Sequence, residues 1–297
     1  LTAAPSKLQV AGDAEFASLA AAVGKDVDGV LAADDIRDAG ALDEYLETKL
    51  ALQLLGGDAD GARATIAAIR ANETKPALRL TADRVPLVAL EARAAVANGT
   101  PAGAAFAAAD RADVAALPWG VVHAQIKNHF GGELVATRAA VVGDIIHDLD
   151  PIWKKSGNLD GPSARELVQS RAFLNDYLPY FAADAPVLRA YIAAHTGVKP
   201  DIWAAREVTL GPAQVRTAVR IGIWDSGVDP HDFPGRMFVD RAGRNGLAFD
   251  PDGRPARADL YPLPAAVAAR YPTLVRRLAG DFDLQVGEIT PDAEAYI

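Results

Sequence analysis

The part of the sequence best suited to chemistry is an aspartate that directly follows a short apolar run. Residues 218–224 are Ala-Val-Arg-Ile-Gly-Ile-Trp, and the turn Asp225-Ser226-Gly227 follows at once. Gly227 permits a tight turn without a Cβ clash, and Ser226 can hydrogen-bond nearby backbone amides. A carboxylate held in this way could orient an imidazole, fix its tautomer and stabilise the imidazolium of a Ser-His-Asp mechanism.

The run before Asp225 has the pattern of a buried parallel strand, because it is short, largely apolar and rich in β-branched residues. α/β folds gather their reactive groups just beyond the carboxyl ends of such strands. Residues 236–239 predict a second short strand, and residues 241–260 are typical of a loop. The sequence therefore predicts that an α/β domain with a parallel sheet begins near residue 198.

The preceding residues, 13–197, predict helices, because alanine is abundant and apolar residues recur at intervals of three and four. Gly56-Gly57 predicts the end of one helix. A capping box at Ser163 and Glu166 predicts the start of another, and Asp184 is placed to cap the helix after it. No fixed repeat period is found, so an irregular helical domain is expected rather than a solenoid.

The change from alanine-rich helical patterns to strand and loop patterns predicts two domains. These are a mostly helical domain over residues 1–197 and the N-terminal portion of an α/β domain over residues 198–297. Thr290 and Pro291 have the pattern of a helix start, only a few residues before Ile297. Since a domain boundary is unusual at such a point, we expect that the α/β domain continues beyond this sequence.

Residues 219–229 (Val-Arg-Ile-Gly-Ile-Trp-Asp-Ser-Gly-Val-Asp) resemble the aspartate motif of subtilisin-like serine peptidases, peptidase family S8. In that family an apolar strand leads into Asp-(Ser/Thr)-Gly-(Ile/Val). A weaker likeness continues through Pro230-His231 and Gly235-Arg236. The resemblance implies a subtilisin-like fold, a polypeptide substrate and peptide-bond hydrolysis with Asp225 as the catalytic aspartate. It also implies that the helical domain is a prodomain or accessory module.

The histidine and serine that the resemblance requires are missing from the sequence. Subtilisin-like peptidases carry Asp, His and Ser in that order, so both partners should follow Asp225. Only His231 and Ser226 do, and neither lies in the family's His-Gly-Thr-His or Gly-Thr-Ser setting. The chain alone is therefore expected to be inactive, and the remainder of the catalytic domain is its expected partner.

The same turn is also compatible with other interpretations. Asp-Ser-Gly-Val also opens glutamate and aspartate racemases, but their chemistry uses cysteine and this chain has none. Haloacid-dehalogenase-type phosphatases need a second aspartate where Gly227 stands. The remaining alternative is that Asp225 only caps a turn, in a non-catalytic helical scaffold or binding module with a degenerate α/β appendage.

Two weaker patterns concern metal ions. His147 lies among Asp144, Asp148 and Asp150, but no second histidine stands at a ligand spacing, so a charged helix end before Pro151 is preferred. The segment 250–253, Asp-Pro-Asp-Gly, is better explained as a tight turn than as a calcium loop. No cofactor is evident, and calcium is the ion that the family resemblance would allow.

The composition excludes some classes of protein. Half of the 297 residues are hydrophobic and the net charge is −9, which argues against a nucleic-acid-binding protein. No apolar run is long enough for a membrane span. The absence of cysteine excludes disulfide and thiolate–metal chemistry. The opening Leu-Thr-Ala-Ala-Pro would suit a mature exported protein, so a secreted or periplasmic location is expected.

Overall fold

The computed structural model describes residues 1–9, 14–195, 197, 202–209, 211–214, 222, 233, 235–244, 246, 249, 253–255 and 264–297. The chain divides into two units, one of Leu1–Thr196 with Thr273–Ile297 and the other of Gly197–Pro272. The predicted division at residue 197 stays a prediction.

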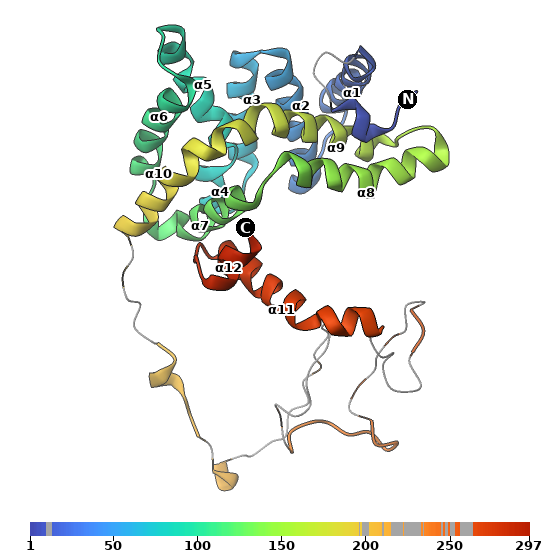
Figure 1. Cartoon of the computed structure of the whole chain (residues 1–297), viewed down its shortest axis with the longest axis vertical. Coiled ribbons are helices and arrows are strands. Elements are labelled where there is room, and N and C mark those ends of the chain that lie inside the picture. Colours follow the sequence, from blue (N-terminus) through green and yellow to red (C-terminus); the bar gives the residue numbers. More distant parts are fainter. Residues whose placement is uncertain are drawn as a thin grey trace. The chain divides into compact units, whose positions relative to one another are not determined.

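Helices are the only regular secondary structure among the described residues of the first unit (Figure 1). Its long helices are α1 (Ala14–Ala33), α2 (Ala39–Gly56), α3 (Ala59–Asn72), α5 (Arg84–Ala97), α6 (Ala102–Ala116), α7 (Trp119–Val135), α8 (Arg138–Ser156), α9 (Gly161–Ala172) and α10 (Phe181–Ala194). Short elements are η1 (Pro5–Leu8), α4 (Pro76–Thr81), the π-helical turn η2 (Phe173–Tyr177) and η3 (Leu178–Tyr180). Near the end lie α11 (Ala265–Gln285) and α12 (Pro291–Tyr296).

Side-chain caps explain several of these helix starts. The Asp38 carboxylate accepts a hydrogen bond from the Ala41 backbone at 2.8 Å and begins α2. Gly57, at φ 74°, ends the same helix in the left-handed conformation that glycine adopts without strain, so the predicted stop is confirmed. The Thr290 hydroxyl accepts from the Ala293 backbone at 3.1 Å, which confirms the predicted start of α12.

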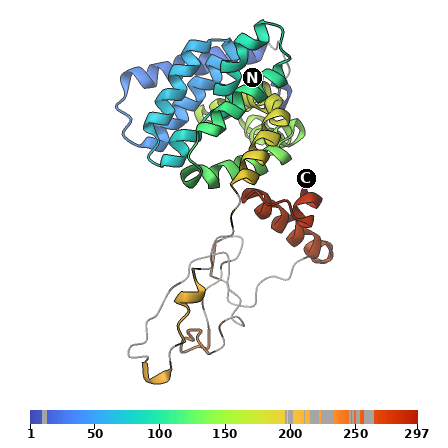
Figure 2. The same cartoon turned by 90° about the vertical axis from the view of Figure 1, so that its left-hand side faces the viewer.

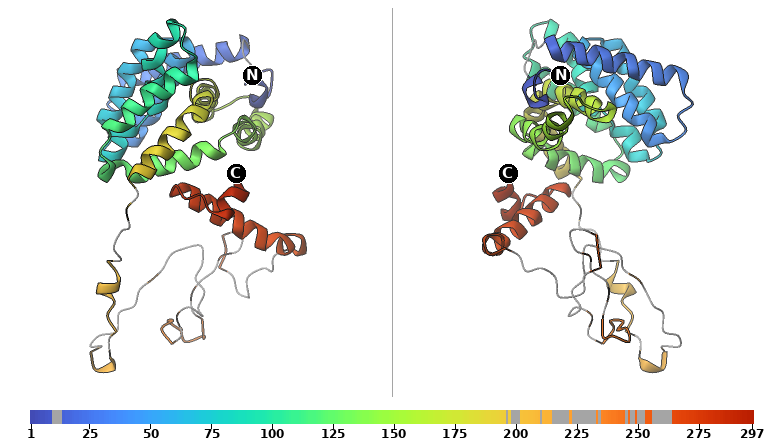
Figure 3. Two further views of the ribbon diagram at one scale, coloured as in Figure 1. Left: turned by 60° about the vertical axis from the view of Figure 1, so that its left-hand side comes forward. Right: turned by 90° about the vertical axis from the view of Figure 1, so that its right-hand side faces the viewer.

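Helices that are close in sequence pair first, and distant ones then close the unit. The α2–α3 and α5–α6 pairs stand side by side (Figure 2). Further along the chain, α9 packs on α2, while α10 packs against both α6 and α7 (Figure 3). The later helices α9 and α10 therefore cover the faces that the earlier pairs leave apolar.

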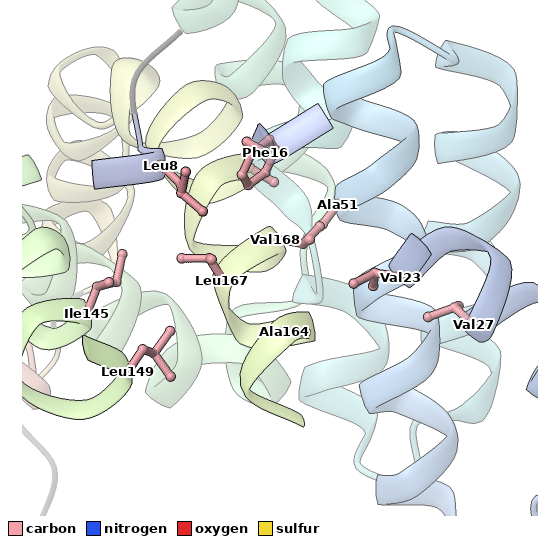
Figure 4. Packing of buried hydrophobic residues seen from close by; sticks show 11 residues of the cluster. Leu8, Phe16, Val23, Val27, Ala51, Ile145, Leu149, Ala164, Leu167 and Val168 are labelled. Atoms are coloured by element: carbon pink, nitrogen blue, oxygen red, sulfur yellow. The ribbon is translucent and has the colours of Figure 1, made fainter. Parts of the chain in front are cut away.

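The largest apolar cluster lies where η1, α1, α2, α8 and α9 meet (Figure 4). Leu8, Leu149 and Leu167 are each at most 1 % exposed, and Phe16 packs beside them. A second cluster joins α6, α7 and α10 through Val122, among others. Burying an aliphatic side chain of this size contributes about 1.5–3 kcal/mol, so these clusters hold the helices in place.

Two glycines allow close backbone approach at the end of the chain. A Cβ at Gly131 of α7 would collide with the carbonyl group of Leu284 in α11. A Cβ at Gly280 would meet the backbone of Asp292 in the same way. The first contact joins α11 to α7 and the second joins α11 to α12, and both are so close that only glycine permits them.

The predicted start of a parallel-sheet α/β domain is wrong: within the described residues the structure contains no strand. Residues 236–239, predicted as a strand, form a turn and an irregular segment, and a single antiparallel bridge joins Phe249 to Pro255. A parallel strand satisfies its backbone groups only by pairing with neighbours. This sequence offers one or two candidate strands, which is too few for a stable sheet.

Three local predictions are also corrected. The carboxylate of Asp160, not Ser163, caps α9, accepting from the Ser163 backbone at 2.9 Å. Asp184 does not cap a helix, because α10 begins at Phe181 and places Asp184 inside its first turn. Helix α8 does not end before Pro151 but continues through it to Ser156. In each case the actual helix starts earlier or runs further than the local pattern predicts.

Candidate functional site

The predicted catalytic residue, Asp225, lies outside the described residues, as do Ser226, Gly227 and His231. The structure therefore neither brings them together nor separates them. Asp225 stays a prediction from sequence.

His147 is described, and its surroundings do not form a metal site. Its Nδ1 lies 2.8 Å from a carboxylate oxygen of the adjacent Asp148, on an exposed face of α8. Asp150 turns away and accepts hydrogen bonds from the backbone and hydroxyl of Ser6. Across the part of the chain that the structure describes, no cluster of three or more histidine or acidic side chains could hold a metal ion.

The structure instead reveals a buried ionic network around Arg84, the first residue of α5. The Arg84 side chain is 1 % exposed. One of its terminal nitrogens donates to Asp110 of α6, and the other donates to both oxygens of Asp184 of α10, at 2.6 Å for Oδ1. Asp113, also on α6, lies 3.8 Å from the guanidinium. One cation therefore bridges three helices.

Glu133 of α7 extends this network without touching Arg84. Its carboxyl group acts electrostatically on those of Asp184 and Asp110, and its Oε2 is buried without a hydrogen-bond partner, as is Oδ2 of Asp110. Burying an ionised carboxylate whose oxygen has no partner costs free energy, whereas a protonated carboxyl group carries no charge and can donate a hydrogen bond. Because the acids outnumber the single guanidinium, the arrangement favours a proton on one of them in the folded state.

The electrostatic surroundings agree with a retained proton. Burial and the neighbouring Asp184 raise the pKa of Glu133 to about 10. Burial also raises the pKa of Asp110 to about 8, although the charge of Arg84 acts in the opposite direction. His129 of α7 adds no second cation, since burial and Arg84 lower the pKa of its imidazole. Four carboxyl groups face one buried guanidinium.

A second buried network begins at the preceding residue. Asp83 has φ 49°, a left-handed conformation that is uncommon for residues other than glycine. Its carboxylate accepts a hydrogen bond from the Tyr177 hydroxyl at 2.7 Å, at the π-helical turn η2. Glu47 of α2 faces Asp83, and burial together with that neighbour raises the pKa of Glu47 to about 8. The adjacent residues Asp83 and Arg84 thus belong to two buried polar networks.

Glu133 also reaches the surface. It lines a groove of about 740 Å³ along α7 and α10, whose walls are mainly apolar, with Phe130, Leu134, Phe181 and Arg189 among them. The Arg189 guanidinium lies 5.3 Å from the centre of the Phe130 ring. Glu133 is therefore the member of the Arg84 network that lines this groove, whereas Arg84, Asp110 and Asp184 are closed off from solvent.

The sequence carries a signal for this network. In α6, Phe106, Asp110 and Val114 follow each other at intervals of four, and all three are buried. Asp184, Leu188 and Tyr191 are likewise spaced by four and three on the buried face of α10. An acidic residue in register with core residues indicates a buried partner of opposite charge. The partner itself cannot be read from that spacing.

Comparison with models of protein families, with curated proteins and with solved structures finds no match for this chain. Among the helices that the structure describes, none has the length and apolar character to cross a bilayer. The family resemblance therefore depends on residues 219–229, and the Arg84 network is a finding of the structure itself.

Proposed function

We propose that the chain contributes the catalytic aspartate, Asp225, to a subtilisin-like serine peptidase. The observation that carries the proposal is the unbroken order of residues 219–229, an apolar run followed by Asp-Ser-Gly-Val-Asp. In this role Asp225 accepts a hydrogen bond from the catalytic imidazole, keeps the correct tautomer and stabilises the imidazolium that forms. Sequence outside these 297 residues supplies the histidine and the nucleophilic serine.

The helical unit then serves as a prodomain or accessory module of the peptidase. The organisation of its interior supports a module that folds by itself: the four apolar clusters draw all of their buried members from Leu8–Ile192. Secretion or transfer to the periplasm belongs to the same proposal. The substrate is a polypeptide.

The test uses the parent protein that contains the whole catalytic domain. Asp225→Asn should lower kcat for a peptide-amide substrate by about 10⁴, because the amide side chain holds the imidazole in the wrong tautomer. Asp240→Asn is the matched control: Asp240 makes only local contacts, accepting from the backbone of Ala242 and Arg244 and pairing with the Arg244 side chain, so turnover should change less than twofold. Unchanged turnover in the Asp225 variant would refute the assignment.

A non-catalytic helical scaffold or binding module is the second candidate. It is favoured by one observation, the purely helical regular structure of the described residues. Determining the coding sequence beyond Ile297 distinguishes the two candidate functions. His-Gly-Thr-His and Gly-Thr-Ser segments there would support the peptidase, and a stop codon would support the scaffold.

A further inference from the structure

We propose that the buried network around Arg84 is a proton-dependent clasp, which holds helices α5, α6, α7 and α10 together while it retains its proton and loosens them when the proton is lost. The clasp lies in the helical unit and is independent of Asp225, so it goes beyond the proposed peptidase. Its four helices contribute Arg84, Asp110, Glu133 and Asp184, respectively.

The acids of the clasp outnumber its cation. Asp110 and Asp184 both accept from Arg84, while Oδ2 of Asp110 and Oε2 of Glu133 are buried and have no hydrogen-bond partner among the described residues. Loss of a proton from this group adds a negative charge that no second buried cation offsets. Since Arg84, Asp110 and Asp184 are each at most 1 % exposed, water cannot screen the repulsion there. The helices that carry these acids must then move apart or admit water.

Charged groups face the clasp from the helices packed around it: Arg70 on α3, Arg84 on α5, Asp110 and Asp113 on α6, His129 and Glu133 on α7, and Asp184 and the groove residue Arg189 on α10. The charge of Arg70 acts on Asp113, and Arg189 is engaged with the Phe130 ring. Among the residues that the structure describes, Arg84 is thus the one cation in direct contact with the acids. It hydrogen-bonds Asp110 and Asp184 and lies 3.8 Å from Asp113.

The direction of the pH effect follows from linkage. An unfolded glutamate releases its proton near its ordinary pKa of 4.5, whereas folding raises the pKa of Glu133 to about 10. Between these values the folded chain holds a proton that the unfolded chain has lost, so raising the pH favours unfolding. The stabilisation is fully present below pH 4.5 and is lost progressively as the pH rises towards 10.

The experiment compares thermal unfolding of the full 297-residue chain at pH 5.5 and pH 8.5 for the wild type, Glu133→Gln and Glu91→Gln. Glutamine keeps a hydrogen-bond donor at position 133 but cannot ionise. We expect Glu133→Gln to match the wild-type Tm within about 1 °C at pH 5.5 and to exceed it by about 4 °C or more at pH 8.5. Glu91→Gln changes an exposed glutamate of α5 and should follow the wild type at both values.

Hydrogen exchange identifies the helices that lose stability as the pH rises. After correction for intrinsic rates, amides of α7 and α10 in the wild type should lose protection at least tenfold between pH 5.5 and 8.5, and those in Glu133→Gln should not. A Glu133→Gln chain with the same pH dependence as the wild type would overturn the proposal. A pH dependence that disappears in Glu47→Gln instead would also overturn it, because the second network would then be responsible.

Discussion

Burying the Arg84 side chain costs free energy, yet the buried acids around it need its positive charge. Removing a guanidinium from water carries a penalty of several kcal/mol, which the contacts with Asp110 and Asp184 offset. Burial by itself would lower the pKa of Arg84, but the charges of these two aspartates outweigh burial and raise it. Arg84 therefore stays charged at any pH at which the helical unit is folded.

Replacing Arg84 by Met should destabilise the chain by about 3–5 kcal/mol at pH 7.5, because the buried acids lose their cation. The loss should be smaller at pH 5.5, where more of the acids hold protons and need no counter-charge. Urea unfolding followed by circular dichroism measures both. Arg111→Met, on an exposed position of α6, is the matched control and should change stability by less than about 0.5 kcal/mol. A loss below about 1 kcal/mol for Arg84→Met would contradict this account of the network.

At the scale of elements, the same helix α7 takes part in two different kinds of contact. On one face Val122, Ile126 and Phe130 pack into the apolar cluster shared with α6 and α10. Near its end, Gly131 brings the α7 backbone close to the carbonyl group of Leu284 in α11. The first contact tolerates repacking of side chains, whereas the second leaves no room for any side chain at all.

Gly131→Ala should therefore destabilise the contact between α7 and α11 by about 1–3 kcal/mol, although alanine favours a helix over glycine. Gly132→Ala is the matched control, since nothing lies near its Cβ position and it should be neutral or stabilising by up to about 1 kcal/mol. Hydrogen exchange in the last turns of α11 reports the difference. Equal protection of α11 in the two variants would show that the close approach does not matter.

At the scale of the whole molecule, the helical unit has its interior within the first two thirds of the chain. Its apolar clusters end at Ile192, and residues 273–297 add Leu284 and Ala293 to the buried set. The closing helices α9 and α10 carry Leu167 and Leu188, both fully buried. A stable helical unit therefore requires the residues up to the end of α10.

A fragment of residues 1–196 should unfold cooperatively in urea, because it contains all four apolar clusters and both buried networks. A fragment of residues 1–156 is the control: it lacks α9 and α10, and with them Leu167, Asp184 and Leu188. That shorter chain should show a broad transition or none. Cooperative unfolding of the shorter fragment, or its absence from the longer one, would contradict this view of the core.

The sequence by itself determined the helical character of residues 13–197, the stop at Gly57 and the start of α12 at Thr290, because propensity, periodicity and caps act within one or two turns. Asp225 also comes from sequence alone. The tertiary structure decided which polar residues meet. Asp184 looked like a local cap, yet its partner Arg84 is 100 residues away. The predicted sheet failed for the same reason, since strands, like buried ion pairs, depend on partners that no local pattern specifies.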